Sequence, residues 1–436
     1  MQYYSTNHQA SHVPLKEAVL KGLPADNGLF MPETIPQLSA GFFDKISSFS
    51  FQEIAFEVSK TLLQDDLPEN VLQNIVEDAI NFDAPLVQIE ENTFCLELFH
   101  GPTLAFKDFG ARFMSRLMEH LLQDSKVELT ILVATSGDTG SAVANGFLSV
   151  EGINVIILYP SRKVSEIQEK QLTTLGNNIT SLEIEGTFDD CQQLVKQAFL
   201  DKELKEKLML TSANSINIAR LIPQSFYYFY AYAQLSKKNN VCVSVPSGNF
   251  GNLTAGLIAK KMGLPVSKFI ASTNVNDIVP KYLETGLFEP KPSQKTLSNA
   301  MDVGNPSNFA RMLELYKNDP GKLGQNDVIG FSFDDEQTKA TIKSVYEKFN
   351  YLLDPHGAIG YLGLSEFRRQ ETGVRSLNEI TGIFMETAHP AKFKDVVEEV
   401  IGEKIEIPER LQVCLQKEKQ STLLSNDFDE LKDFLL

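Results

Sequence analysis

Residues 100–113, HGPTLAFKDFGARF, place Lys107 in an otherwise apolar stretch that follows a Gly-Pro turn. Its neighbours include Phe106 and Phe109, and partial burial among such rings disfavours the charged form of an amine. A neutral amine is a nucleophile. The same pattern also suits a helix-surface lysine whose stem lies across phenylalanine rings. The stretch alone leaves both interpretations open.

A glycine-containing loop, PSGNFGN (246–252), follows the strand-like VCVSV and precedes the helix-like LTAGLIAKKMG. Glycines at Gly248 and Gly251 allow backbone N–H groups to converge, and the helix N-terminus adds a favourable dipole. The loop could therefore hold a phosphate without a lysine or arginine. The alternative is a strand-to-helix turn that only needs glycine. Neither GxxxxGK[ST] nor GxGxxG occurs in the sequence.

A second loop, ATSGDTGSA (134–142), has the same position between a strand and a helix and is rich in hydroxyl groups. Hydroxyls and free N–H groups at a helix N-terminus suit a carboxylate or a second phosphate. The alternative is that Ser136 or Thr139 simply caps the helix. A nucleophilic amine with two anion sites is what pyridoxal phosphate chemistry requires, since the cofactor and the substrate each bring an anion.

The elements that must position these residues alternate between strands and helices from residue 129 onward. Short β-branched runs such as LTILVA, NVIILYP, SLEIEG, VCVSVP, KFIAST and GIFMET lead into loops or helical segments. This order predicts a parallel sheet with covering helices, whose ligands collect beyond the carboxyl ends of the strands. Residues up to about 83 are expected to be mainly helical, and the charged tail from about 401 is expected to pack as an appendage.

The composition argues against a nucleic-acid-binding, membrane-spanning, metal-binding or disulfide-rich protein. The chain has 436 residues, enough for two or three domains, and its 40 basic and 57 acidic side chains give a net charge of -17. This charge disfavours nucleic acids and anionic lipid surfaces. The four cysteines lie far apart and the six histidines form no HExxH, so we expect no metal site and no disulfide framework. No apolar run reaches the length of a membrane span and the N-terminus lacks a signal-peptide pattern, so a cytoplasmic location is expected.

Six segments, in order along the chain, together resemble threonine synthases of the longer bacterial and fungal type. They are DNGLFMP (26–32), HGPTLAFKDFGARF (100–113), TSGDTGSA (135–142), SANSINIARLIPQ (212–224), PSGNFGN (246–252) and METAHPAKF (385–393). The resemblance implies the type II fold of pyridoxal-phosphate enzymes, which has two α/β domains after an N-terminal domain. We therefore expect a mainly helical N-terminal domain over 1–83, a two-part α/β catalytic core over 84–400 and a C-terminal appendage over 401–436.

The resemblance also implies roles for residues around pyridoxal phosphate. Lys107 is similar to the family's Schiff-base lysine, and Thr387 to the hydroxyl partner of the pyridine nitrogen. The cofactor-phosphate loop would consist of Gly248, Asn249, Phe250, Gly251 and Asn252. Asp138 stands where shorter family members have an asparagine that faces the cofactor's 3'-oxygen. A carboxylate beside that oxygen would have to share a proton with it or turn away.

The substrate-binding residues implied by the resemblance fall into two groups. The substrate carboxylate would be held by Ser136, Gly137, Thr139 and Gly140. The candidates for the substrate phosphate are Asn214, Ser215, Asn217, Arg220 and Lys163. A guanidinium such as that of Arg220 can donate two parallel hydrogen bonds to a phosphate, although an arginine on a helix is more often a surface ion-pair partner.

The implied reaction converts O-phospho-L-homoserine and water to L-threonine and phosphate by γ-elimination and then β-addition, the last step of threonine biosynthesis. The enzyme would act on this small molecule as a monomer or homodimer. Two alternatives remain open. One is another type II lyase or dehydratase that acts on serine or threonine, and the other is a non-catalytic homologue that binds the cofactor or a phosphorylated amino acid.

Overall fold

The computed structural model of the chain describes residues 1–123, 125, 128–317, 319, 322–371 and 380–436. The chain divides into two compact units by its internal contacts. Unit 1 contains Met1, Pro32–Phe106 and Leu221–Glu406, and unit 2 contains Gln2–Met31, Lys107–Arg220 and Ile407–Leu436. Residues 1–83, expected to form one domain, are thus shared between the two units. The domain boundaries expected near residues 83 and 400 remain predictions.

Unit 1 is built on a six-stranded sheet in the order β12-β11-β10-β13-β5-β4, parallel except for the antiparallel pair β4 and β5. Its strands are β4 (Leu86–Glu90), β5 (Thr93–Glu97), β10 (Val241–Pro246), β11 (Val266–Thr273), β12 (Val328–Ser332) and β13 (Thr381–Glu386). Every residue of β10 and β13 is buried. Strands covered on both faces have nearly continuous apolar sequences, which is the pattern of VCVSVP and TGIFME.

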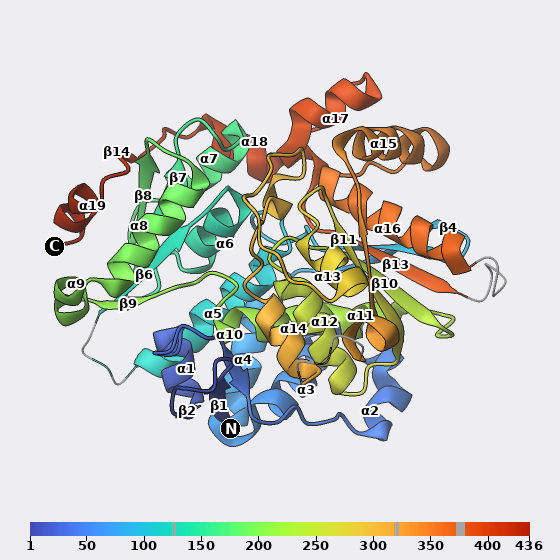
Figure 1. The fold of residues 1–436 in the computed structure, drawn as a ribbon, viewed down its shortest axis with the longest axis horizontal. Coiled ribbons are helices and arrows are strands. Elements are labelled where there is room, and N and C mark those ends of the chain that lie inside the picture. Colours follow the sequence, from blue (N-terminus) through green and yellow to red (C-terminus); the bar gives the residue numbers. More distant parts are fainter. Residues whose placement is uncertain (124, 126–127, 318, 320–321, 372–379) are drawn as a thin grey trace. The chain divides into compact units, whose positions relative to one another are not determined.

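Helices cover this sheet (Figure 1). Helix α16 packs on β10, β11 and β13, and α15 packs on α16. A buried cluster that includes Ile270, Leu364 and Phe384 fills the space between these elements. The helices of unit 1 are α2 (Ala40–Lys45), α3 (Phe51–Leu63), α4 (Glu69–Ala79), α11 (Phe226–Gln234), α12 (Gly251–Lys261), α13 (Ile278–Thr285), α14 (Phe309–Leu315), α15 (Asp335–Phe349), α16 (Pro355–Glu371) and α17 (Lys394–Ile401). Short 3-10 turns include η3 (Ile222–Ser225), η4 (Asn299–Met301) and η7 (Pro390–Phe393).

Unit 2 contains a five-stranded parallel sheet in the order β14-β8-β7-β6-β9. Its strands are β6 (Leu129–Ala134), β7 (Ile153–Pro160), β8 (Ile179–Ile184), β9 (Met209–Thr211) and β14 (Thr422–Leu424). Strand β6 is buried along its whole length. Leucines of β6, β7 and β8 pack against α8 and α19 in one apolar cluster that includes Leu132, Leu158 and Leu182.

The helices of unit 2 begin at capping residues that the sequence supplies. Thr187 forms a capping box with Asp190 at the start of α8, and Ser165 forms one with Gln168 at the start of α7. The helices are α1 (Leu15–Lys21), α5 (Lys107–Leu122), α6 (Asp138–Gly146), α7 (Glu166–Thr173), α8 (Phe188–Leu200), α9 (Lys202–Lys207), α10 (Ile218–Leu221), α18 (Glu409–Gln416) and α19 (Phe428–Leu435). Helix α5 packs on α1 and α6.

The C-terminal tail contributes the edge strand β14, which the sequence analysis did not predict. Lys419 holds the tail to the sheet by ion pairs with Glu169 at 2.7 Å and Glu183 at 2.5 Å. The prediction of a mainly helical N-terminal region was incomplete as well. Besides α1 to α4, a small sheet in the order β2-β1-β3 is formed by β1 (Gln2–Ser5), β2 (Val13–Pro14) and β3 (Phe30–Pro32).

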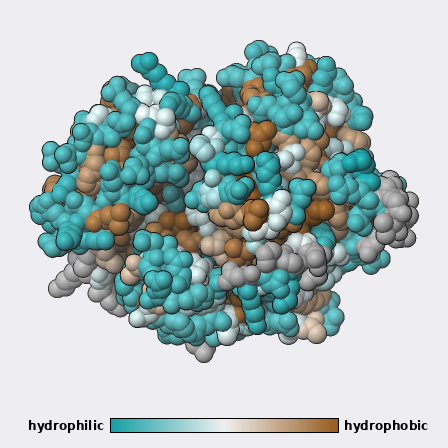
Figure 2. Space-filling view, viewed as in Figure 1, coloured by the Kyte–Doolittle hydropathy of each residue, from teal (hydrophilic) through white to brown (hydrophobic). Residues whose placement is uncertain are grey.

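Hydrophilic side chains cover most of the face shown in Figure 2, and hydrophobic ones form small separate groups among them. Among the described residues, no helix is both long and apolar enough to span a membrane. The four cysteines are present as free thiols, and three of them, Cys95, Cys191 and Cys242, are buried.

Candidate active site

Lys107 is the first residue of α5, and its side chain is half-buried. The N-terminal end of a helix carries partial positive charge, which disfavours an ammonium group there and favours a neutral amine. The segment that leads to Lys107 is fixed within unit 1. The N–H of Phe106 donates to the carbonyl of Thr387 at 2.9 Å, and the buried ammonium of Lys392 donates to the carbonyl of Thr103 at 2.9 Å. These hydrogen bonds hold the segment that ends at Phe106, the residue before Lys107.

The loop after β10 has the geometry of an anion cradle. A Cβ atom on Gly248 would lie 2.7 Å from the carbonyl oxygen of Ala300 and 2.7 Å from the Cα of Met301, so only glycine fits there. Phe250 adopts a left-handed conformation, with φ of 60°, just before α12 begins. The first N–H groups of a helix have no partner within the helix and point toward an anion.

Two asparagines hold this loop in place. The amide of Asn252 donates to the carbonyl of Pro246 at 2.8 Å and accepts from the hydroxyl of Ser247 at 3.1 Å. The side-chain oxygen of Asn249 accepts from the N–H of Ser307 at 2.6 Å. The side chains therefore support the loop, while its backbone N–H groups remain the donors suited to a phosphate.

Thr387 follows β13, and its side chain is buried. Strands β10 and β13 are parallel neighbours, with Ser244 opposite Phe384. The loops that follow these two strands therefore leave the same edge of the sheet, so unit 1 brings the glycine loop and Thr387 to one side. Each of these features fits one part of pyridoxal phosphate: a cradle without side chains fits its phosphate, and a hydroxyl fits its ring nitrogen.

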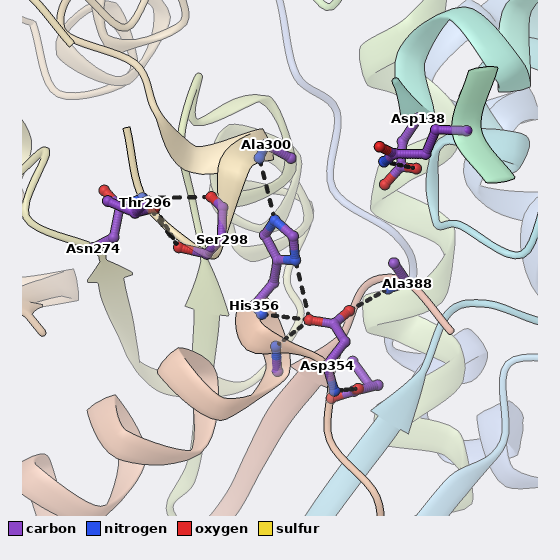
Figure 3. A network of polar contacts seen from close by, with 11 residues as sticks. Asp138, Asn274, Thr296, Ser298, Ala300, Asp354, His356 and Ala388 are labelled. Atoms are coloured by element: carbon purple, nitrogen blue, oxygen red, sulfur yellow. Dashed lines mark hydrogen bonds and ion pairs between the residues drawn. The ribbon is translucent and has the colours of Figure 1, made fainter. Parts of the chain in front are cut away.

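Three buried ionisable residues near the Thr387 segment were not found by sequence analysis: Asp354, His356 and Glu386. Figure 3 shows Asp354 and His356. The carboxylate of Asp354 accepts from the ring Nδ1 of His356 at 3.0 Å and from the N–H of Ala388 at 3.1 Å. Burial raises the pKa of Glu386 well above its ordinary value, and the negative charge of Asp354 adds to this effect. Glu386 therefore keeps its proton to a higher pH than an exposed glutamate does. Asp354 comes directly before Pro355 and an apolar helix, which is a helix-start signal that could have been noticed.

In unit 2, the N–H groups at the start of α6 and in the loop before it are bound by Thr135, and not by Ser136 or Thr139 as considered from the sequence. The hydroxyl of Thr135 accepts from the N–H groups of Gly137 at 3.0 Å and Gly140 at 2.8 Å. The hydroxyls of Ser136 and Thr139 are half-buried and make no hydrogen bond within the described part of the chain. The capping alternative for these two residues is therefore wrong, and both hydroxyls are available to a ligand.

Asp138 is held by a residue that the sequence analysis missed. The amide of Gln168, itself 1% exposed, donates to the carboxylate of Asp138 at 2.9 Å (Figure 3). Gln168 also packs on Gly137, where a Cβ atom would lie 2.5 Å from the Gln168 Cδ and where φ is 139°. Only glycine adopts this conformation easily. Gln168 thus fixes both the backbone and the acidic side chain of the loop.

The segment 212–220 combines buried polar residues with half-buried ones. The amide of Asn217 donates to the carbonyls of Val19 at 2.9 Å and Ser212 at 3.2 Å, and accepts from the N–H of Ala219 at 3.0 Å. Both the nitrogen and the oxygen of the Asn217 amide therefore have hydrogen-bond partners in the backbone, so this side chain holds the segment in place. Asn214 and Ser215 are half-buried, and the Asn214 side-chain oxygen has no hydrogen-bond partner among the described residues.

Arg220 is buried rather than at the surface, which excludes the exposed ion pair considered from the sequence. Its guanidinium donates to the carbonyl of Ala213 at 2.7 Å. Burial lowers the pKa of Arg220 to about 10, and the charge of Asp108 on α5 opposes this shift. A Cβ atom on Gly110 would lie 2.7 Å from the Arg220 Nε, so α5 packs directly on Arg220. By contrast, Lys163 is exposed in the loop after β7.

Strands β6, β7 and β9 are parallel, so the loops that carry Ser136, Lys163 and Asn214 leave one edge of the unit 2 sheet. Each unit thus brings its own set of expected site residues to the carboxyl edge of a sheet. The meeting of the two sets around one cofactor remains a prediction. Among the described residues, no group of three or more His, Cys, Asp or Glu side chains could hold a metal ion.

Three family models match the chain: "Threonine synthase N terminus" over residues 2–80, "Pyridoxal-phosphate dependent enzyme" over 82–375, and "Threonine synthase, C-terminal" over 358–435. The chain is 48% identical to a threonine synthase of Haemophilus influenzae over 100% of both chains. It is 45% identical to a threonine synthase of Escherichia coli, covering 100% of this chain and 99% of that one.

Solved structures of threonine synthases also match this chain. The crystal structure of threonine synthase from Escherichia coli matches with a TM-score of 0.92 and 44% identity, covering 100% of this chain and 99% of that one. A pyridoxal-phosphate-bound threonine synthase from Brucella melitensis matches with a TM-score of 0.91 and 35% identity, covering 100% and 98%. A threonine deaminase from Solanum lycopersicum, at 16% identity and a TM-score of 0.58, shares the fold alone.

Proposed function

The chain belongs to the threonine synthase family of pyridoxal-phosphate-dependent enzymes, and from this we infer that it converts O-phospho-L-homoserine and water to L-threonine and phosphate. Bound pyridoxal phosphate supplies an electron sink that makes the carbon-bound protons of an amino acid acidic enough to leave. The chain's own residues must bind the two anionic molecules, orient them and move those protons. The product places the enzyme at the last step of threonine biosynthesis.

Lys107 is the proposed covalent anchor of the cofactor and the base that moves protons at the substrate carbons. A base must be uncharged at the moment it accepts a proton. The half-buried position of Lys107 at the start of α5 supports this role, because both partial burial and the helix dipole favour the neutral amine.

The cofactor phosphate is proposed to bind at Gly248, Asn249, Phe250, Gly251 and Asn252. The absence of room for a side chain at Gly248 and the start of α12 behind Phe250 support this assignment. Thr387 is the proposed partner of the ring nitrogen. Asp138 is the proposed neighbour of the cofactor's 3'-oxygen, and the hydrogen bond from Gln168 would let it turn one carboxylate oxygen away from that group.

The substrate carboxylate is proposed to bind at Ser136, Gly137, Thr139 and Gly140, supported by the two hydroxyls that cap no helix. For the substrate phosphate, Asn214, Ser215, Arg220 and Lys163 are the proposed donors. Asn217 is proposed to support this segment through its bonds to backbone carbonyls.

The proposed partner is the small-molecule substrate, and the enzyme is proposed to act in the cytoplasm as a monomer or homodimer. The free thiols of Cys95, Cys191, Cys242 and Cys414 support a reducing compartment.

The observation that most supports the proposal is the hydrogen bond between Phe106 and Thr387, since it fixes the approach of the chain to Lys107 at the proposed ring-nitrogen partner. The test is steady-state phosphate release from O-phospho-L-homoserine by the holoenzyme, with the amino-acid product identified by chromatography. Threonine and phosphate in equal amounts are expected. A keto acid from serine or threonine, without phosphate release, would instead identify a dehydratase, and cofactor binding without turnover would identify a binding protein.

A further inference from the structure

We propose that Asp354 and His356 are positioning residues that fasten the glycine loop of the cofactor site to the Thr387 segment. The inference rests on the proposed cofactor site, and it concerns only residues of unit 1. Neither residue is expected to touch the cofactor or the substrate. Their task is to keep two loops, which leave neighbouring strands, in one fixed arrangement.

We call the pair Asp354 and His356 the brace, and Asp354 forms one half of it. It is 0% exposed, and one of its carboxylate oxygens caps α16 by accepting from the backbone N–H groups of His356 and Gly357. The other oxygen accepts from the N–H of Ala388 at 3.1 Å. Asp354 thus ties the residue after Thr387 to the start of a helix that packs on the sheet.

His356 forms the other half, and its two ring nitrogens have different tasks (Figure 3). Nδ1 lies 3.0 Å from the Asp354 carboxylate, to which it must donate. Nε2 lies 3.3 Å from the backbone nitrogen of Ala300, whose N–H can only donate. The ring is therefore the neutral tautomer with its proton on Nδ1. A proton on Nε2 would face the N–H of Ala300 and break this hydrogen bond.

Ala300 completes the connection to the glycine loop. Its carbonyl oxygen would be 2.7 Å from a Cβ atom on Gly248, so the η4 turn lies directly on that loop. A continuous path therefore runs from Ala388 through Asp354 and His356 to Ala300 and Gly248. The ring of His356, 3% exposed, also packs edge-on against Phe393 at a centroid distance of 5.0 Å. Movement of the ring would disturb both loops together.

Two amide variants of His356 separate the two hydrogen bonds. In His356→Asn, the amide nitrogen occupies the position of Nδ1 and can still donate to Asp354, but nothing reaches Ala300. In His356→Gln, the amide oxygen occupies the position of Nε2 and can accept from Ala300. Loss of this partly buried hydrogen bond leaves the N–H of Ala300 without its protein acceptor, and a loss of about 1.4 kcal/mol would weaken binding about tenfold. His12→Asn, at an exposed histidine, is the control for the substitution itself.

The measurement is the Kd of the apoprotein for pyridoxal phosphate, obtained by equilibrium dialysis, together with the apoprotein Tm. We expect about a tenfold higher Kd for His356→Asn, a Kd close to that of the unmodified chain for His356→Gln, and similar Tm values for both. Equal Kd values for all variants would overturn the proposal. Equal losses of affinity and Tm in both variants would also overturn it, since they would make His356 an ordinary core residue.

A spectroscopic measurement tests the tautomer independently. Selective 15N labelling of the six histidines should give one ring, absent from the His356→Gln spectrum, with a protonated Nδ1 and an unprotonated Nε2. A protonated Nε2 would contradict the brace. Neither measurement needs the amino-acid substrate. If the chain binds pyridoxal phosphate but releases no phosphate from O-phospho-L-homoserine, the proposed reaction fails while the brace is still tested.

Discussion

The backbone N–H of Phe106 donates a 2.9 Å hydrogen bond to the carbonyl of Thr387, although the two residues are far apart in the chain. Nearby, Ala105 and Ala388 form an isolated antiparallel bridge. The segment before Lys107 is therefore held by the segment that provides the proposed ring-nitrogen partner. Any shift of one of these segments must be followed by the other, and this dependence is the basis of the predictions that concern the cofactor.

Replacing Lys107 with alanine should abolish turnover and the visible absorption band of the bound cofactor. The variant removes the only amine proposed to bond to pyridoxal phosphate, while the charge and packing elsewhere stay the same. Absorption spectra and phosphate-release assays of the purified variant measure both effects. Lys207→Ala is the matched control, because Lys207 is exposed and forms a surface ion pair with Glu203 at 2.9 Å. A Lys107 variant that kept both the band and the activity would refute the assignment.

Gly248→Ala should weaken cofactor binding and destabilise the chain. The added Cβ atom would lie 2.7 Å from two backbone atoms of the η4 turn, which cannot move away as the end of a side chain could. Overpacking of this kind costs about 1–3 kcal/mol. Urea unfolding of the apoprotein and dialysis against pyridoxal phosphate measure the two effects.

The control for this substitution is Gly41→Ala in α2. The nearest atom to a Cβ on Gly41, outside the backbone of the same helix and the adjacent residues, would be the Ser39 hydroxyl at 4.0 Å, and alanine favours a helix more than glycine does. We expect Gly41→Ala to be neutral or slightly stabilising. Equal unfolding midpoints and equal cofactor affinities for the two variants would show that the Gly248 loop tolerates a side chain.

Gln168→Glu should raise the KM for O-phospho-L-homoserine and lower the free energy of unfolding. The change keeps the shape of the side chain but replaces the N–H that Asp138 accepts with an oxygen, so two carboxylates would face each other at about 2.9 Å. Loss of such a buried hydrogen bond costs about 1–3 kcal/mol before any repulsion between the charges. Because Gln168 also packs on Gly137, the carboxylate-binding loop should be disturbed.

Steady-state kinetics and urea unfolding measure these effects. Gln192→Glu, at an exposed position of α8, introduces the same charge at the surface and should leave the KM and the unfolding midpoint unchanged. The double variant Asp138→Asn/Gln168→Glu restores a donor opposite the new carboxylate, so it should recover part of the lost stability. Failure of this recovery would show that the Asp138 contact is not the source of the effect.

The sequence was sufficient for features that depend on local patterns. The runs LTILVA and VCVSVP predicted β6 and β10 to the residue, because strands buried on both faces are continuously apolar. The glycine loops were found because they require glycine at fixed positions. Gln168 and His356 were missed, since each acts through a partner on another element and a lone Gln or His carries no periodic signal. The tail strand β14 was missed because its pairing with β8 is equally non-local.

Glu386→Gln should increase stability relative to the unmodified chain as the pH rises. Burial, and then the charge of Asp354, raises the pKa of Glu386 well above its ordinary value of 4.5. In the unfolded chain this group loses its proton above about pH 4.5, whereas the folded chain keeps it to a higher pH. The folded state then binds more protons than the unfolded state, so Glu386 lowers stability as the pH rises through this interval. Glutamine cannot ionise and removes that loss.

The expected result is a difference in unfolding midpoint, variant minus unmodified chain, that is smallest near pH 4.5 and grows as the pH rises above it. The glutamine oxygen can still accept from the N–H of Asp354, as Glu386 does, so the packing of β13 on α16 should be preserved. Urea unfolding at a series of pH values measures the difference, with the exposed Glu403→Gln as the control for loss of an acidic group. If the difference instead shrank with rising pH, the pKa of Glu386 would not be raised in the folded chain, and the prediction would be wrong.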